Sequence, residues 1–302
     1  MPASRKYLDA EAIARLRGLE LRARAIVAGF ISGMHRSAYR GYSVEFAEHR
    51  QYVPGDDIRH IDWRVFGRAD RMYIKQFEEE TNLRCNLLVD MSHSMLYGSG
   101  PLNKFDYAAT LAACFAYLLI HQNDAAGLIT FDSQVRSRLH CTTGRGHLLD
   151  LLAVLAETRP AGQTDVKILF HRLAEELQHR STVVLLSDLL TDVDDLLGGI
   201  EHICLAGHEL VVFHVLDRDE WSFPFAENVF FEGLEDDVKL LADPQSLRAS
   251  YLNAVQRFTT RVRAVCLKHG ADYVPVNTHD PLSGVLSGFL AKRAGRAAGA
   301  RR

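Results

Sequence analysis

The sequence of 302 residues has no large excess of charge of either sign and no long apolar run. Lysine and arginine number 35 against 38 aspartates and glutamates, and the net charge of -3 does not suggest a nucleic-acid-binding protein. The longest strongly apolar stretch, at 111–120, is about half of what a bilayer span needs. The N-terminus carries acids and lacks the apolar core of a signal peptide. We therefore expect a soluble, cytoplasmic protein without membrane insertion.

Paired cysteines and the common catalytic motifs are also missing. None of the five cysteines forms a CxxC pair, and four of them lie in apolar runs, so we expect small buried side chains in a reducing compartment. The chain contains no GxxxxGK[ST] or GxGxxG loop, no GxSxG turn and no HExxH pair. The sequence therefore offers no motif for nucleotide binding, serine hydrolysis or zinc chemistry.

From residue 84 onward, apolar runs alternate with helical patterns. The runs are CNLLVD, AAGLITFD, TVVLLSDLL, HELVVFHVLD and ADYVPVN, and VRSRLHC reads as an edge strand. Strands that are apolar throughout and separated by helices predict a parallel sheet covered on both faces. We therefore predict one doubly wound, mainly parallel α/β domain over 84–291, with the strand from Arg84 in the centre between those at 124–132 and 182–188.

The remaining segments read as additions to this domain. Leucine, isoleucine and alanine recur at helical spacing over 8–30, which predicts an amphipathic helix that ends near Gly33. A polar, turn-rich stretch follows, with small strands expected at YSVEF and MYIKQF. Residues 1–83 bury too little apolar surface to fold alone, so we expect them to pack on the main domain. The aromatic anchors of that packing would be Trp63, Phe66, Tyr73 and Phe77. Residues 218–243 read as an insertion with a hairpin, and 292–302 as a basic tail.

Oxygen-bearing side chains gather where the predicted strands end. Asp90 ends the first apolar run, with Ser92 and Ser94 directly after it, and Asp188 ends the third. Thr164 precedes a predicted helix. Ligands of parallel sheets bind beyond the carboxyl ends of the strands, and two buried acids there carry a desolvation cost that one cation removes. Carboxylate and hydroxyl donors without histidine or thiol suit Mg²⁺, Mn²⁺ or Ca²⁺.

Structural alternatives exist for each of these residues. Asp188 could cap the next helix, and the serines could cap the helix from Lys104, although that helix starts some ten residues later. Asp165 reads as an acid at a helix N-terminus. Thr142 and Thr143 lie nearer to Asp90 in sequence and compete with Thr164 as the threonine of the site.

The stretch GDDIRHIDW at 55–63 interleaves acids with arginine and histidine. Such interleaving is typical of a self-satisfied ion-pair network that holds an irregular segment in place, with Trp63 as its buried anchor. Recognition of a partner protein through this segment is the second interpretation.

The pattern Asp90-x-Ser92-x-Ser94, with a later threonine and aspartate, resembles the metal-ion-dependent adhesion site of von Willebrand factor A domains. Together with GMHRSAYRGYSVEFAEHRQYVPGDDIRHIDW upstream and SDLL downstream, the chain resembles the MoxR-associated family known as domain of unknown function 58. The resemblance implies a von Willebrand factor A-like fold and a cation that recruits an acidic side chain of a partner. It implies metal ligands at Asp90, Ser92, Ser94, Thr164 and Asp188. It also implies a MoxR-type AAA+ ATPase and a client protein as partners.

These observations favour a non-catalytic, cation-dependent interaction module that assists the ATPase in maturation or assembly of other proteins. A metal-dependent hydrolase at the same site is the alternative from another class. Two-metal hydrolysis, however, uses more clustered carboxylates and a base. The third hypothesis is a structural scaffold with a vestigial metal site.

Overall fold

The computed structural model describes residues 10–34, 49–51, 73–75, 83–164, 170, 177, 180–226, 229–234 and 239–300. They belong to two compact units, one of residues 1–37 with 83–302 and one of residues 38–82. In the second unit, β1 (His49–Gln51) and β2 (Tyr73–Lys75) form an antiparallel pair. Strand β2 lies within the predicted run MYIKQF, whereas β1 follows YSVEF. The GDDIRHIDW stretch, Asp165, Trp63, Phe66 and Phe77 lie outside the described residues, so their predicted roles stay predictions.

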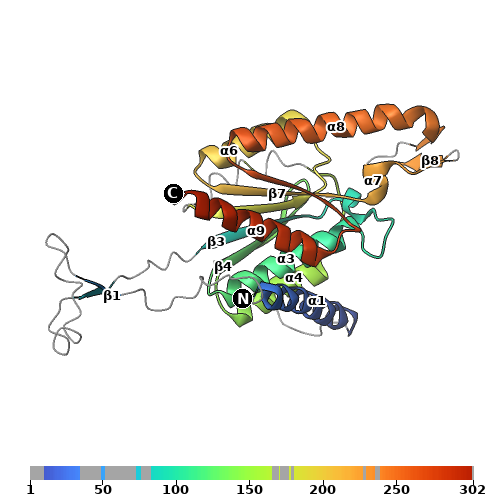
Figure 1. The fold of residues 1–302 in the computed structure, drawn as a ribbon. Helices are drawn as coiled ribbons and strands as arrows, with labels where there is room; N and C mark the ends of the chain where they lie inside the picture. Colours follow the sequence, from blue (N-terminus) through green and yellow to red (C-terminus); the bar gives the residue numbers. More distant parts are fainter. Residues whose placement is uncertain are drawn as a thin grey trace. The chain divides into compact units, whose positions relative to one another are not determined.

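The first unit is built on a six-stranded sheet with the order β10-β7-β6-β3-β4-β5. The strands are β3 (Arg84–Asp90), β4 (Ala125–Phe131), β5 (Val135–Thr142), β6 (Thr182–Ser187), β7 (Glu209–Leu216) and β10 (Asp272–Asn277). All neighbours are parallel except β4 and β5, and β5 is an edge strand. The predicted doubly wound, mainly parallel sheet is confirmed, with β3 between β4 and β6 (Figure 1).

Helices cover both faces of this sheet (Figure 1). One face carries α1 (Ala10–Met34), α3 (Lys104–His121), α4 (Arg145–Glu157) and α9 (Leu282–Ala300), and the other carries α6 (Val193–Leu205) and α8 (Pro244–Lys268). Successive side chains of a strand point to opposite faces. Leu87 and Val89 of β3 accordingly enter the first core, and Leu88 enters the second. Buried on both faces, β3 has no polar alternation, which explains its continuous apolar sequence.

Helix α3 is the central helix of its layer. Fourteen of its residues are buried, from Lys104 through Leu119, so it is apolar around most of its circumference. The apolar run at 111–120 is therefore explained by burial inside the protein. Within the part of the chain that the structure describes, no helix combines the length and apolarity that a bilayer crossing requires.

The insertion and the C-terminal segment also take regular structure. The insertion holds α7 (Arg218–Ser222) and the predicted hairpin, formed by β8 (Val229–Glu232) and β9 (Lys239–Ala242). The basic segment from 292 begins inside α9, where Arg293 forms a 2.6 Å salt bridge with Glu209. All five cysteines are free thiols, and three of them are buried in the core.

Candidate metal centre at the carboxyl edge of the sheet

Strand register brings Asp90 and Asp188 to the same edge of the sheet. Strands β3 and β6 are parallel neighbours in which Val89 pairs with Leu186, so Asp90 lies next to Ser187. The Ser187 hydroxyl donates to Oδ2 of Asp90 at 2.5 Å. Asp90 and Asp188 are at most 1 % exposed. The prediction that both strand-end carboxylates lie buried at one edge is confirmed.

The loop after β3 folds back on Asp90. The backbone N–H of Ser92 donates to Oδ1 of Asp90 at 2.9 Å, and the hydroxyls of Ser92 and Ser94 lie 3.0 Å apart. Both serines are buried, and Ser94 belongs to the short 3-10 helix η2 (His93–Leu96). Helix α3 is capped by Asn103, which accepts from the N–H of Asp106. The alternative that Ser92 or Ser94 caps α3 is therefore excluded, and the two hydroxyls contact each other next to Asp90.

Backbone hydrogen bonds hold the Thr164 loop against the loop after β3. The N–H of Ala161 donates to the carbonyl of Met91 at 2.7 Å, and that of His93 to the carbonyl of Gly162 at 2.9 Å. Gly162 has a φ of +81°, and a Cβ there would lie 3.1 Å from the Asp132 carboxylate, so this position favours glycine. This arrangement places the Thr164 hydroxyl 3.4 Å from Oδ2 of Asp90.

The competing threonines lie at the other end of the sheet. Thr142 pairs with Ala126 at the start of β4, whereas Asp90 pairs with Phe131 at its end. Because β4 is seven residues long, Thr142 and its neighbour Thr143 are separated from Asp90 by the length of the strand. Among the three candidates, Thr164 alone reaches Asp90.

A buried lysine that the sequence reading did not single out contacts Asp188. The ammonium of Lys104 lies 2.7 Å from Oδ2 of Asp188 and 2.6 Å from Oε1 of Glu220. Lys104 is 0 % exposed and is the first residue of α3. A cation is unfavourable at a helix N-terminus, where the macrodipole is positive, unless acids face it. A lysine at the start of a predicted helix is therefore the sequence feature that could have indicated an acidic partner for Lys104.

The Glu220 carboxylate belongs to a second group of contacts, between the loops after β3 and β7. Asp217 caps α7 and accepts hydrogen bonds from both the N–H (3.1 Å) and the hydroxyl (2.5 Å) of Ser99. The Tyr97 hydroxyl donates to Asp219 at 3.1 Å. The glycine-containing loop around Ser99 is thus held by an aspartate of the loop after β7.

Burial and charge shift the pKa values of this cluster. Burial, reinforced by the neighbouring Asp188, raises the pKa of Asp90 to about 7, although hydrogen bonds from Ser187 and Ser92 oppose the shift. Burial alone would lower the pKa of Lys104, but the carboxylates of Asp188 and Glu220 outweigh it and raise that pKa. Burial lowers the pKa of His214 to about 4. Its ring contacts the Asp188 carbonyl at 3.0 Å and the Tyr273 hydroxyl at 2.6 Å, so both ring nitrogens have partners in the core.

The donor set around Asp90 fits a hard divalent cation. Asp90 has only hydroxyl and amide partners, and among the described residues it forms no salt bridge. A buried carboxylate whose pKa lies near neutrality and whose neighbours are neutral oxygens is stabilised when a positive charge binds to it. Among the described residues, at this site as elsewhere, no three histidine, cysteine, aspartate or glutamate side chains gather as a metal site, so any ion at Asp90 would depend on hydroxyl ligands. Clustered carboxylates for two-metal hydrolysis are therefore absent from the described part.

Comparisons with known proteins place the chain among uncharacterised relatives. Proteins of Mycobacterium bovis and Mycobacterium tuberculosis, both named uncharacterized, are 28 % identical over 297 residues, which cover 96 % of this chain and 93 % of theirs. Among solved structures, the conserved hypothetical protein BatB from Bacteroides thetaiotaomicron has a TM-score of 0.48 at 14 % identity, covering 70 % of this chain and 99 % of that one. The SpRpn10 VWA domain has a TM-score of 0.42 at 14 % identity, covering 68 % and 94 %.

These structural similarities concern the fold only. The sequence itself carries the assignment: residues 48–261 match the model of the family described as "Protein of unknown function DUF58", and the chain belongs to this family.

Proposed function

We propose that this protein is a non-catalytic protein-interaction module whose bound divalent cation attracts an acidic side chain of a partner. The observation that carries the proposal is the state of Asp90. Its carboxylate is 0 % exposed, has no cationic partner among the described residues, and lies beside the hydroxyls of Ser187 and Thr164. A buried carboxylate of this kind is costly unless a positive charge binds to it.

Asp90, Ser92, Ser94, Thr164 and Asp188 would hold the ion, and Mg²⁺ or Mn²⁺ suits their oxygens best, with Ca²⁺ as the alternative. When bound, the ion supplies an electrophilic centre with coordination positions left for an outside carboxylate. The chain's own residues prepare the site. Ser187 and the Ser92 N–H orient Asp90. Lys104 fixes Asp188 and offsets one of the two negative charges.

The partners in this proposal are a MoxR-type AAA+ ATPase and a client protein whose maturation or assembly it assists. Support comes from the upstream GDDIRHIDW segment and the acid-and-serine loop, which together resemble the MoxR-associated family. The ATPase would be recognised at the cation or through the upstream segment, and the client would supply an aspartate or glutamate.

A structural scaffold with a vestigial metal site is the second candidate, and one observation favours it. Lys104 already lies 2.7 Å from Asp188, so one of the two carboxylates has a permanent counter-ion. A scaffold would gain little from added metal, whereas an interaction module would be stabilised by it through mass action.

The deciding experiment measures the melting temperature and Mg²⁺ or Mn²⁺ binding of the wild type and of Asp90→Ala, each in EDTA and after restored metal. We expect metal to raise the melting temperature of the wild type and to leave Asp90→Ala unchanged. Asp194→Ala, which removes an exposed carboxylate of α6, is the matched control and should respond like the wild type.

Pull-down of the ATPase or client under the same conditions then tests the partner. Binding that is indifferent to chelation would remove the cation from the mechanism. Phosphatase or peptidase turnover that is lost in Asp90→Ala would instead favour the hydrolase.

A further inference from the structure

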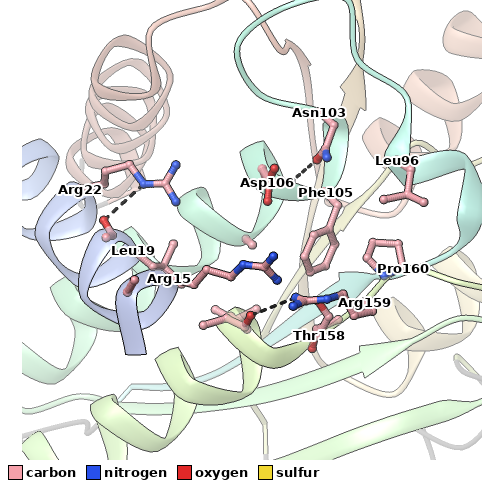
Figure 2. A pocket seen from close by; sticks show the side chains of 15 residues that line it. Arg15, Leu19, Arg22, Leu96, Asn103, Phe105, Asp106, Thr158, Arg159 and Pro160 are labelled. Atoms are coloured by element: carbon pink, nitrogen blue, oxygen red, sulfur yellow. Dashed lines mark hydrogen bonds between the residues drawn. The ribbon is translucent and has the colours of Figure 1, made fainter. Parts of the chain in front are cut away.

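A cavity of about 630 Å³ lies between α1, the start of α3 and the end of α4 (Figure 2). This volume lies within the usual range of binding pockets. Its apolar floor is formed by Leu19, Phe105 and Leu155, each at most 5 % exposed. Because three separate elements contribute this floor, the pocket is a feature of the folded domain and not of one loop.

The rim of the pocket is positively charged. Figure 2 shows the guanidinium groups of Arg15, Arg22 and Arg159 extending into the pocket, with Asp106 as the one acid among the lining residues. Arg22 donates to the carbonyl of Gly18 at 3.3 Å, and Arg159 to the carbonyls of Ala156 and Thr158 at 3.5 Å.

Within the described residues, neither Arg22 nor Arg159 forms a salt bridge with a carboxylate. The chain as a whole has a net charge of -3, so this rim is a local reversal of sign. Low-dielectric walls below convergent cations strengthen the attraction for an anion.

Two residues that line the pocket are neighbours in sequence of the loops that form the candidate metal centre. Leu96, which lines the pocket, belongs to the same short helix η2 as Ser94. Pro160, also a lining residue, precedes Ala161, whose N–H holds the Thr164 loop onto the loop after β3. A ligand that fills the pocket would therefore contact Leu96 and Pro160, which adjoin the two loops that carry proposed metal ligands.

We propose that this pocket binds an acidic segment of the partner protein, with an apolar side chain on the floor and carboxylates against Arg22 and Arg159. The inference deepens the proposed function and rests on it for one point, that the occupant is a protein. Arginine suits such an occupant because its planar fork binds carboxylates through two parallel hydrogen bonds.

The same features argue against a nucleic acid as the occupant. Single-stranded nucleic acids bind to extended basic grooves with exposed aromatic rings on which bases stack. Here Phe105, the one aromatic residue among those that line the pocket, is 5 % exposed and forms part of the floor. A pocket with an apolar floor and a positively charged rim is complementary to an amphipathic acidic peptide.

Two variants test the shape of the pocket and the charge of its rim separately. Gly18 lines the pocket, and a Cβ there meets nothing within 4 Å, so Gly18→Leu fills the cavity while favouring the helix. Gly29→Leu is the matched control, because Gly29 lies on the same helix with equally open surroundings and does not line the pocket. The double variant Arg22→Glu/Arg159→Glu reverses the rim, and Arg24→Glu is its control, on an exposed residue of α1 outside the pocket.

The experiment uses the full chain and a short fluorescein-labelled peptide that alternates glutamate with leucine. Fluorescence anisotropy is recorded first in EDTA and then in excess MgCl₂. We expect Gly18→Leu and the double arginine variant to weaken binding in EDTA by about tenfold or more, which corresponds to losing one strong contact. We expect Gly29→Leu and Arg24→Glu to bind like the wild type.

Several results would overturn the pocket proposal. These are no measurable peptide binding by the wild type, equal losses in the controls, or equal affinity for a peptide with lysine in place of glutamate. Displacement of the peptide by an equal concentration of a single-stranded oligonucleotide would assign the pocket to nucleic acid and also overturn it.

The measurements in excess MgCl₂ test the proposed function separately from the pocket proposal. Asp90→Ala should lose only the increase in affinity that Mg²⁺ produces and should keep the binding seen in EDTA. If the increase is missing in the wild type while the pocket variants still lose affinity, the cation mechanism fails and the pocket stands.

Discussion

Asp90 and Asp188 end neighbouring strands of one sheet and are equally buried, yet the protein surrounds them differently. Asp188 has an internal counter-ion, since Lys104 lies 2.7 Å from its carboxylate. Asp90 is surrounded by hydroxyls and amides, and its pKa rises to about 7 because of burial and of Asp188. The two sites share position and chemistry and differ in whether the fold supplies the positive charge.

In the proposed function, this difference gives Asp188 a fixed contact besides its place in the metal site and leaves Asp90 dependent on the ion for a positive charge. A buried charge with a fixed partner contributes to a defined arrangement of the elements around it, here the start of α3 with Lys104 and helix α7 with Glu220. A buried charge without one destabilises the metal-free protein and makes it responsive to an added cation. The four variants below test this contrast, in order of decreasing expected effect.

Replacing Lys104 should have the largest effect on stability. In Lys104→Met, the buried Asp188 and the largely buried Glu220 lose their cation, and we expect the free energy of unfolding to fall by about 3–5 kcal/mol. Urea unfolding at neutral pH measures this loss. Adding Asp188→Asn and Glu220→Gln should recover most of it. A Lys104→Met variant as stable as the wild type would show that the ion pairs do not hold α3, α7 and the end of β6 together.

Replacing Asp90 should act in the opposite direction. Because the folded-state pKa of Asp90, about 7, exceeds the ordinary 3.8, its ionisation weakens the metal-free fold as pH rises through that interval. We expect Asp90→Asn to stabilise the protein in EDTA by roughly 1–3 kcal/mol at pH 8, and by less at pH 5. Unfolding at both pH values tests the sign. A destabilised variant at pH 8 would mean that Asp90 has a counter-charge after all.

The Thr164 loop depends on Gly162. Alanine there combines a φ of +81° with a Cβ 3.1 Å from the Asp132 carboxylate, so we expect Gly162→Ala to cost about 1–2 kcal/mol and to weaken Mg²⁺ binding. Gly198→Ala in α6, where a Cβ meets nothing within 4 Å, is the control and should be neutral or stabilising. Calorimetric titration of Mg²⁺ with unchanged affinity in Gly162→Ala would remove Thr164 from the site.

The smallest effect is expected for an exposed ion pair with the same chemistry as the buried one. Arg261 and Asp194 lie 2.8 Å apart with side chains 56 % and 84 % exposed. We expect Arg261→Ala to change the free energy of unfolding by less than about 1 kcal/mol, since water screens the pair. A loss as large as that of Lys104→Met would contradict the argument that burial decides the contribution.

Much of the fold follows from local patterns in the sequence, because buried parallel strands need continuous apolar runs. The runs at 85–90 and 182–187 became the central neighbours β3 and β6, and the strand-end acids followed from their parallel register. The resemblance already favoured Thr164 over Thr142 and Thr143, but only the strand direction, which no local pattern encodes, places those two at the far end of the sheet. The Lys104 interaction depended on a helix start meeting a strand end 84 residues away, a contact that only the tertiary structure determines.

The two edge strands of the six-stranded sheet bear on whether copies of this protein can pair strand to strand. Edge strands with free backbone groups are templates for pairing with another chain. Strand β5 shifts register twice against β4 and carries Arg136 and Arg138, and β10, at the opposite edge, contains Pro275, which has no N–H to donate. Both edge strands of the described sheet therefore resist ordered polymerisation. Strand-to-strand pairing of two copies through these two edges is accordingly disfavoured.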